Sequence, residues 1–431
     1  MKLVCDLHMH SKYSRATSKE MNLEPLAMWA GLKGIDVLGT SDFTHPLWFG
    51  ELEQKLEEQD KGFYKLKGKE DSPFFVLSSE ISCIYSKNGR LRKIHLVILS
   101  PSLEDTRKIN NALTGRGNLF SDGRPILGID AKELCKIIFD NSPDAIIIPA
   151  HIWTPWFSLF GANSGFDNFE ECFGELSQNI FTIETGLSSD PQMNWRLSQL
   201  DKKSIVSCSD AHSPSKIGRE ATVFNLEKPD FNSLRDALQT SNRVLKDSDN
   251  EKSTVSGQLS NVILYTIEFY PEEGKYHYTG HRNCNVVQSP EETKEKGATC
   301  PQCGRKLTVG VMHRVEQLAD RPTSYKAENR PPFKSLVPFL EIIAEMQEVQ
   351  VTSKKVQSDY LKLVSHFKSE FNILLDEPIE NIKKENEKIA EGIKRVREGR
   401  LSISPGYDGV FGKVKIWKKA EELKQKQSSL F

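Results

Sequence analysis

The sequence lacks long apolar runs and carries no large excess of charge of either sign. No uninterrupted apolar stretch approaches the roughly 20 residues that cross a bilayer, so we expect no membrane partner. A histidine motif begins within ten residues of Met1, which leaves no room for an N-terminal signal pattern. The formal net charge is −1, so total charge does not indicate whether nucleic acid is a partner.

Cysteine is also scarce, with eight residues in a chain of 431. Three of them, Cys284, Cys300 and Cys303, form a cluster, and the other five are isolated in apolar surroundings. Isolated thiols beside a zinc-type cluster favour a reducing compartment over a disulfide scaffold, so we expect a cytoplasmic protein. A chain of this length is typical of two or three domains, each with its own core.

Up to residue 245, short apolar strands alternate with helical stretches. The predicted strands lie at residues 3–5, 37–40, 74–77, 94–99, 145–148, 180–183 and 204–207. Helical patterns lie between them, for example at 26–33 and 132–139. These seven strand–helix alternations favour an α/β fold, a parallel (β/α)7 barrel over residues 1–245. In such barrels the chemistry lies at the carboxyl ends of the strands.

Polar side chains are found at those strand ends. His8 and His10 follow the first strand, and because side chains alternate along a strand, both imidazoles project to one face. The other candidates are Asp42, His45, Glu80, His95, His151, Glu184, Asp210 and His212. A single histidine there is more often a hydrogen-bonded core residue, but six of them beside Glu80 and Asp210 would be left unsatisfied without a cation. The sequence therefore predicts a multinuclear metal site.

These motifs resemble the polymerase-and-histidinol-phosphatase (PHP) family of phosphoesterases. The resemblance lies in Asp6-Leu7-His8-Met9-His10, Glu80 with His95, Pro149-Ala150-His151 and Ser209-Asp210-Ala211-His212. It implies a distorted barrel that holds up to three metal ions. A first ion would be bound by His8, His10, Glu80 and Asp210, a second by Glu80, His95 and His151, and a third by His45 and His212. Glu80 would bridge the first two.

The chain departs from the PHP pattern in two places. Asp42 and His45 are separated by two residues where the family has them adjacent, and the further histidine that often follows the first pair is missing. The third ion is therefore the one in doubt, and Asp42 is either a ligand or a support for one. Glu184 is likewise either a ligand or a support for one, and we prefer the second role, in which it accepts a hydrogen bond from a metal-bound histidine.

The predicted chemistry is hydrolysis of a phosphate ester by metal-activated water. Ions roughly 3.5–4 Å apart lower the pKa of a bridging water and neutralise charge on the attacking and leaving oxygens. We assign the catalytic roles to Asp210, Glu80, His8 and His10, and no serine or cysteine nucleophile is needed. Two or three ions are expected, and imidazole-rich ligation suits zinc, manganese or iron better than magnesium.

Basic residues and one tyrosine near the predicted site are candidates for contacts with a substrate phosphate. A glycine-punctuated segment at residues 114–125 is either a mobile surface loop or a substrate clamp. The candidates are Arg116 and Arg124 in that segment, Lys12, Tyr13 and Arg15 after the first histidine pair, and Lys216 and Arg219 after His212.

A zinc-binding module is predicted over residues 258–325. His281 and Cys284 have two residues between them, as do Cys300 and Cys303, and this spacing gives the four ligands of one structural zinc ion. His277 or His313 is an alternative to His281 with poorer spacing. A closed four-ligand site has no open position for water, so it stabilises the fold. Such modules either contact nucleic acid or only hold domains together.

The C-terminal region, residues 326–418, has helical periodicity at 336–349, 360–375 and 379–397, followed by a predicted hairpin at 399–416. Residues 383–426 contain thirteen Lys plus Arg against seven Asp plus Glu, a local balance of +6. That balance suits phosphate contacts, with Lys413 and Lys415 as candidates, although a solvated helix face explains it nearly as well.

A PHP barrel followed by this zinc module, the run at 313–321 and the hairpin looks like the endonuclease Q family. The resemblance covers nearly the whole chain and implies a DNA-repair endonuclease, which would be nucleoid-associated. It implies incision 5′ to deaminated bases (uracil, hypoxanthine, xanthine) or abasic sites in double- or single-stranded DNA. We expect a monomer. The tail at 419–431 resembles peptides that dock on the bacterial sliding clamp through Gln427, Leu430 and Phe431, or is an ordinary polar tail.

Two other functions are compatible with parts of the sequence. A phosphatase of the histidinol-phosphate type would explain the barrel but would leave the C-terminal residues without a role. A DNA- or clamp-binding scaffold without turnover would explain the C-terminal region but not the complete ligand set.

Overall fold

The structure is a computed structural model that describes residues 1–240 and 260–417. The predicted clamp peptide, with Gln427, Leu430 and Phe431, lies outside the described residues. The chain divides into two compact units. Unit 1 comprises Met1–Gly31, Ile35–Glu268 and Val311–Lys334, and unit 2 comprises Leu32–Gly34, Phe269–Gly310 and the chain from Ser335 onward.

This division differs from the predicted boundaries at 258 and 325. Strand β12 (Val262–Glu268) pairs with β11 (Ala221–Asn225), so it belongs to the sheet of unit 1 and not to the zinc module. Helix α9 (Val311–Leu318) also lies in unit 1, where Arg314 donates hydrogen bonds to the carbonyl oxygens of Phe160 and Phe166 at 3.0 and 3.1 Å.

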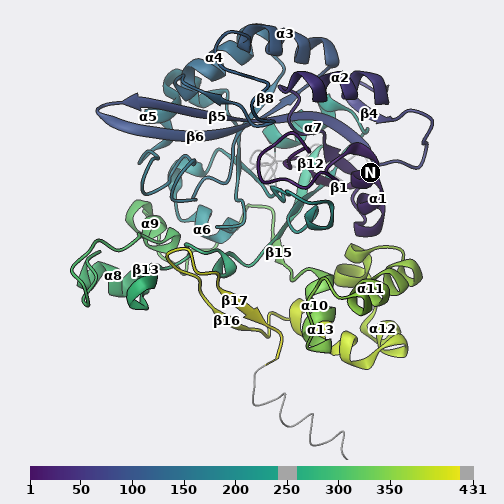
Figure 1. The fold of residues 1–431 in the computed structure, drawn as a ribbon, viewed down its shortest axis with the longest axis vertical. Coiled ribbons are helices and arrows are strands. Elements are labelled where there is room, and N and C mark those ends of the chain that lie inside the picture. The colour runs from purple at the N-terminus through teal and green to yellow at the C-terminus, as the bar shows by residue number, and fades with distance from the viewer. Residues whose placement is uncertain (241–259, 418–431) are drawn as a thin grey trace, which may run out of the picture. The chain divides into compact units, whose positions relative to one another are not determined.

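Unit 1 is built on an eleven-stranded sheet in the order β15-β12-β11-β1-β2-β5-β4-β3, with β6 and β7 paired to β5 and β8 paired to β6. Besides β11 and β12, its strands are β1 (Lys2–Asp6), β2 (Val37–Gly39), β3 (Leu56–Asp60), β4 (Phe63–Leu66), β5 (Phe74–Lys87), β6 (Arg90–Ser100), β7 (Ile126–Leu127), β8 (Ile146–Pro149) and β15 (Phe333–Ser335). The helices of unit 1, which are labelled in Figure 1, are α1 (Leu23–Lys33), α2 (Pro46–Lys55), α3 (Leu103–Leu113), α4 (Ala131–Asn141), α5 (Phe169–Phe173), α6 (Pro191–Trp195), α7 (Phe231–Thr240) and α9.

The prediction of an all-parallel sheet is wrong. β1, β2 and β5 are parallel to one another, but β5 and β6 form a long antiparallel hairpin and β6 is antiparallel to β8. The reason is the turn between β5 and β6, where Asn88 and Gly89 have φ of 54° and 70°. Asn-Gly is the preferred two-residue connection of antiparallel strands, because both positions need positive φ.

The predicted closed barrel is not confirmed, whereas the mixed α/β fold is. Within the described residues, β9 (Thr182–Glu184) and β10 (Ser204–Val206) form a separate parallel pair outside the large sheet. Each of these two strands has only three residues, so each can form few backbone hydrogen bonds with the strands of the large sheet. Single contacts join them to their neighbours instead, including the amide of Ile152 with the carbonyl of Glu184 at 3.2 Å and a parallel bridge between Met9 and Ala211.

The alternation predicted for the first strand is present. Leu3, Cys5 and Leu7 are buried in the core together with Val37, Val76 and Phe224 of neighbouring strands. The intervening positions continue to His8 and His10, which are buried but do not belong to this apolar cluster. One face of the strand therefore packs the core while the other carries the polar site.

The described part of unit 2 contains two small sheets and a group of helices. The sheets are the hairpins β13–β14 and β16–β17. The elements are β13 (Thr279–His281), β14 (Val286–Gln288), α8 (Pro290–Lys296), α10 (Phe339–Gln347), α11 (Lys354–Phe367), α12 (Ile379–Glu385), α13 (Glu387–Arg397), β16 (Ser402–Ser404) and β17 (Lys413–Lys415). Helices and the hairpin are found in the predicted region, but α11 begins before the predicted helix at 360–375 and ends at Phe367, where Lys368 has φ of 74°. The third predicted helix breaks at Asn386 into α12 and α13. The Asn386 side chain accepts a hydrogen bond from the amide of Ile389 and caps α13.

No helix in the described ranges of the chain combines the length and the apolar character that crossing a membrane requires.

The buried carboxyl group of Glu268 makes the stability of unit 1 depend on pH. Burial raises its pKa from 4.5 to about 8, although Thr185 and Ser207 donate hydrogen bonds to Oε2 at 3.0 and 3.1 Å. Because the folded-state pKa is raised, the stabilising effect of the protonated form is lost as the pH rises through about 8. We expect Glu268→Gln to increase the free energy of unfolding at pH 9 by about 2–4 kcal/mol relative to wild type, and much less at pH 5.

Thermal unfolding at both pH values would measure this effect. Glu57→Gln, which changes an exposed glutamate of β3, is the matched control. An equal effect of Glu268→Gln at both pH values would show that Glu268 is already ionised in the folded protein.

Candidate metal centre

Local backbone geometry brings the predicted site residues of unit 1 together. Asp42, His151 and Asp210 have φ of 44°, 31° and 46°, a region that side-chain-bearing residues rarely adopt. Hydrogen bonds hold two of these positions, from the amide of His151 to Glu184 Oε2 at 2.8 Å and from the amide of Asp210 to the carbonyl of His8 at 2.9 Å. Such strained positions persist only where surrounding contacts fix them, and they are concentrated at functional sites.

The first group of candidate ligands consists of His8, His10 and Asp210, whose donor atoms all lie within 4.8 Å of one another. Asp210 Oδ1 is 3.0 Å from His10 Nε2 and 3.9 Å from His8 Nε2. Both histidines are buried, whereas the Asp210 side chain is 25% exposed. Solvent can therefore reach this group from the side of Asp210.

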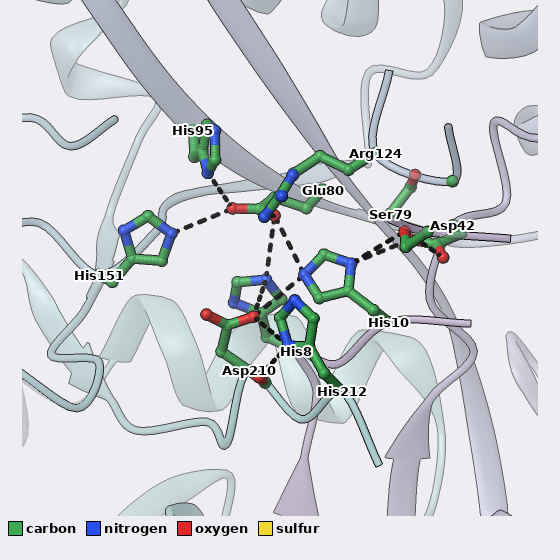
Figure 2. A network of polar contacts seen from close by, with 12 residues as sticks. His8, His10, Asp42, Ser79, Glu80, His95, Arg124, His151, Asp210 and His212 are labelled. Carbon is green, nitrogen blue, oxygen red and sulfur yellow. Dashed lines mark hydrogen bonds and ion pairs between the residues drawn. The ribbon is translucent and has the colours of Figure 1, made fainter. Parts of the chain in front are cut away.

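The second group consists of Glu80, His95 and His151. Glu80 Oε1 is 2.6 Å from His95 Nδ1 and 3.1 Å from His151 Nε2. Its other oxygen, Oε2, faces the first group, 3.3 Å from His10 Nε2 and 3.7 Å from His8 Nε2 (Figure 2). One buried carboxylate thus lies between the two groups, with one oxygen directed to each.

Two further acids orient the histidines of the first group. His8 Nδ1 donates to Glu184 Oε1 at 2.9 Å, and His10 Nδ1 lies 3.3 Å from Asp42 Oδ1. Asp42 is itself fixed by the backbone amide and the hydroxyl of Ser11, at 2.7 and 2.6 Å. A carboxylate on Nδ1 leaves the Nε2 lone pair directed into the site, so the geometry of both acids favours the supporting role over ligation.

The donor atoms fit divalent metal ions. His8 Nε2, His10 Nε2, His95 Nδ1 and Asp210 Oδ1 are buried and have no well-directed hydrogen-bond partner. Burial lowers the pKa of His95 to about 4 despite the nearby Glu80, which favours the neutral form of imidazole that binds a metal. Imidazole nitrogens and carboxylate oxygens in this ratio suit zinc, manganese or iron.

His45 and His212 belong to neither group of candidate ligands among the described residues. The His45 ring stacks on Tyr13 with centroids 4.3 Å apart, and its Nε2 donates to the carbonyl of Phe120 at 3.3 Å. His212 lies against His10, with ring centroids 4.5 Å apart. A third ion bound by both residues remains a prediction.

Several predicted phosphate-contact residues have intramolecular partners. Lys12 forms an ion pair with Glu51 at 2.8 Å, and Tyr13 donates its hydroxyl hydrogen to the same carboxylate. Arg219 donates hydrogen bonds to the carbonyls of Ser209 and Asp210, at 2.8 and 3.2 Å, so it supports the turn that carries Asp210.

Arg124 is the predicted contact residue that reaches the metal centre. Its guanidinium lies 3.1 Å from Glu80 Oε2, and its side chain is 25% exposed. Others lie at the surface: Arg15 and Arg116 have mostly or partly exposed side chains, and Lys413 and Lys415 are exposed on β17. Lys216 lies in a short 3-10 helix at Pro214–Lys216.

The role of Asp6 was not predicted from the sequence. Its carboxylate is fully buried and accepts hydrogen bonds from the amides of Ser209 and Gly218, at 3.0 and 2.8 Å. It therefore ties the loop that carries Asp210 to the strand that carries His8 and His10. The sequence feature that could have indicated this role is an acidic residue at the end of an otherwise apolar strand, where an unpaired charge would be costly.

The four predicted zinc ligands of unit 2 form one cluster. The donor atoms of His281, Cys284, Cys300 and Cys303 lie within 4.8 Å of one another, and His281 Nδ1 is 3.4 Å from Cys303 Sγ. His281 lies at the end of β13, which places it opposite the Cys300–Cys303 turn. The alternatives His277 and His313 are not part of the cluster.

Comparison with known proteins places the chain in a family. The segment at 338–400 matches a family model described as the MJ0043 C-terminal domain. The uncharacterised protein MJ0043 of Methanocaldococcus jannaschii is 30% identical over 265 residues, which are 61% of this chain and 31% of that protein. The chain therefore spans about a third of the length of that relative.

Over its whole length the chain is similar to PfuEndoQ, a lesion-specific endonuclease from Pyrococcus furiosus. The TM-score is 0.82 and the identity 30%, with 99% of each chain covered. The chain belongs to the endonuclease Q family. A second endonuclease Q structure, in complex with a 27-mer duplex substrate that has an abasic lesion at the active site, has the same TM-score and identity and covers 97% of this chain and 98% of that one.

For this endonuclease Q family member, Glu80 is the residue on which metal content should depend most, because it lies between both ligand groups. We expect Glu80→Gln to reduce the Mn²⁺ bound per chain and to weaken its affinity by at least about tenfold. Calorimetric titration of metal-stripped protein would measure this change. Glu133→Gln, at an exposed position of α4, is the control, and unchanged Mn²⁺ binding by Glu80→Gln would contradict the metal centre.

The cluster of His281, Cys284, Cys300 and Cys303 should bind one zinc ion independently of the metal centre in unit 1. We expect Cys303→Ser to lower the zinc content by one ion per chain and to destabilise unit 2, because closed four-ligand sites contribute directly to folding. Zinc released on thiol modification, detected with a chromogenic chelator, measures the content. Cys83→Ala, at an isolated cysteine, should release as much zinc as wild type, and an unaltered zinc content of Cys303→Ser would refute the assignment.

Proposed function

We propose that this protein is a metal-dependent DNA-repair endonuclease that nicks DNA on the 5′ side of deaminated bases or abasic sites. The bases would be uracil, hypoxanthine and xanthine, and the products a 3′-hydroxyl and a 5′-phosphate. The observation that carries the proposal is the pair of ligand groups that share Glu80. The chain is similar over its whole length to endonuclease Q, a lesion-specific enzyme whose structure has been determined with an abasic duplex. This similarity supports DNA as the substrate.

The residues of the two groups have distinct tasks in this proposal. His8, His10 and Asp210 would hold one ion, His95 and His151 a second, and Glu80 would contact both. When bound, the ions supply a water of lowered pKa and charge neutralisation at the phosphate. Glu184 and Asp42 keep the imidazoles of His8 and His10 oriented, which preserves ligand geometry without rearrangement.

Arg124 supplies a fixed positive charge at the same place. Its guanidinium is held by Glu80 and remains partly exposed, so a phosphate oxygen can replace or share that contact. Arginine binds phosphate through paired N–H donors, which orients the phosphate as well as attracting it. We therefore assign Arg124 to the scissile phosphate.

The remaining basic residues would contact the DNA backbone away from the cut. Lys413 and Lys415 are exposed on the hairpin of unit 2, and Arg15 and Arg116 have exposed side chains in unit 1. Such contacts hold the duplex without reading its sequence. Recognition of the lesion would require the altered nucleotide to leave the stack, which costs less where base pairing is already weak.

The test is incubation of the protein with Mn²⁺ and an end-labelled duplex that contains one deoxyuridine. We expect a single nick on the 5′ side of the lesion and none in the undamaged duplex. Release of phosphate from histidinol phosphate without nicking would instead indicate a small-molecule phosphatase. If the protein bound the duplex but cut it with none of the divalent metals tested, it would be a DNA-binding scaffold.

Asp210→Asn separates cutting from binding in the same assay. The substitution removes one anionic ligand at the exposed side of the first group, so we expect the nicking rate to fall by at least about 10³-fold while the affinity for lesion DNA changes less than about threefold. Asp144→Asn, at an exposed aspartate, is the control. Nicking at the wild-type rate by Asp210→Asn would show that the metal site has been misplaced.

A further inference from the structure

Phe120 is a large aromatic side chain that is 63% exposed in the loop beside the metal centre. It lies between α3 and β7, in the segment predicted as a surface loop or substrate clamp. A single exposed apolar residue is common on protein surfaces and carries no meaning alone. The contacts that hold Phe120 and the position of its loop are what distinguish it.

The ring of Phe120 is the exposed end of a row of aromatic side chains. Its centroid is 6.0 Å from that of His45, the His45 ring stacks on Tyr13 at 4.3 Å, and Tyr13 is 6.2 Å from Trp48. Trp48 is fully buried, and its indole N–H donates to the carbonyls of Thr40 and Ser41 at 3.0 and 2.9 Å. The row therefore runs from the core to the surface and gives the Phe120 ring a firm base.

Hydrogen bonds also fix the backbone of Phe120. Its amide donates to Asn118 Oδ1 at 3.0 Å, and its carbonyl accepts the hydrogen bond from His45 Nε2. Asn118 in turn accepts a hydrogen bond from the hydroxyl of Ser121 at 2.8 Å. An exposed ring on an ordered backbone loses little conformational entropy when a ligand stacks on it.

The loop is anchored at the metal centre just beyond Phe120. A Cβ atom added to Gly123 would lie 2.2 Å from Asp42 Oδ2, so the backbone there packs directly on the acid that supports His10. The next residue, Arg124, contacts Glu80. The exposed ring is therefore separated by three residues from a side chain that touches the candidate metal ligand.

The surroundings of the ring suit a nucleobase better than a protein partner. A protein interface needs a broad apolar patch, whereas Leu119 is buried and the exposed neighbours of Phe120 in the loop, Asn118 and Ser121, are polar. Arg116 and Arg124, which precede and follow Phe120 in the same loop and have side chains that are 45% and 25% exposed, supply positive charge. A flat apolar ring beside cationic side chains matches the combination of base and phosphate in a nucleic acid.

We propose that Phe120 inserts into the DNA stack beside the lesion and stacks on a base that the departing nucleotide leaves exposed. This inference rests on the proposed nuclease function. Apolar side chains inserted in this way stabilise unstacked and bent DNA. Phe120 is a positioning residue here, because it acts on the geometry of the DNA and not on the reacting atoms.

The test compares Phe120→Ala, Phe120→Trp and wild type on two duplexes. In one the deoxyuridine is paired with adenine, and in the other it faces a one-nucleotide gap, so that it has no pairing partner and leaves the stack at lower cost. We expect Phe120→Ala to bind and nick the paired substrate about tenfold less well, to lose much less on the gapped substrate, and to retain wild-type Mn²⁺ content and thermal midpoint. Phe120→Trp should restore both activities.

The control is Leu91→Ala, which shortens an exposed apolar residue of β6 outside the loop and should behave as wild type on both substrates. Equal losses by Phe120→Ala on the paired and gapped duplexes, or no loss on either, would overturn the stacking role while leaving the nuclease function intact. Failure of wild type to bind or cut either duplex would overturn both proposals.

Discussion

The structure of unit 1 depends on one buried charge, the carboxylate of Glu80. Its side chain is fully buried, where an isolated ion would be strongly disfavoured. Burial alone would raise its pKa, but His95, Arg124 and His8 hold the pKa of Glu80 well below its usual value. The acid is thus tolerated only because positive or polarisable partners surround it, and divalent ions would supply the same compensation more completely.

Three further buried acids also need partners, and they support the residues around Glu80. Glu184, Asp42 and Asp6 are buried and each accepts hydrogen bonds from residues that carry or hold candidate ligands. Their partners are distant along the chain: 176 residues separate His8 from Glu184, and 203 separate Asp6 from Ser209. A change in any of these acids would therefore disturb the site through the orientation of a neighbour, without removing a ligand.

Unit 2 contains a separate candidate metal site, the cluster of His281, Cys284, Cys300 and Cys303. The elements that carry the cluster are short, and β13 and β14 have three residues each, so they bury little apolar surface. Small modules of this kind commonly use a metal in place of a core. Tyr407 and Asp408 of the C-terminal hairpin region contact the module, with Asp408 Oδ2 accepting a hydrogen bond from the amide of Arg282 at 2.7 Å. The zinc site and the basic hairpin are therefore parts of one unit.

The sequence by itself determined the local features: the face shared by His8 and His10, the spacing of the four zinc ligands, the positions of most strands and the C-terminal helices. These follow from side-chain periodicity and ligand spacing, which act over a few residues. Only the tertiary structure decided that β6 pairs antiparallel with β8, that Glu184 and Asp42 orient imidazoles, that His45 stacks on Tyr13, and that Arg124 reaches Glu80. Each of these depends on which distant segments pack together, and the energy of such contacts leaves no periodic pattern in the chain.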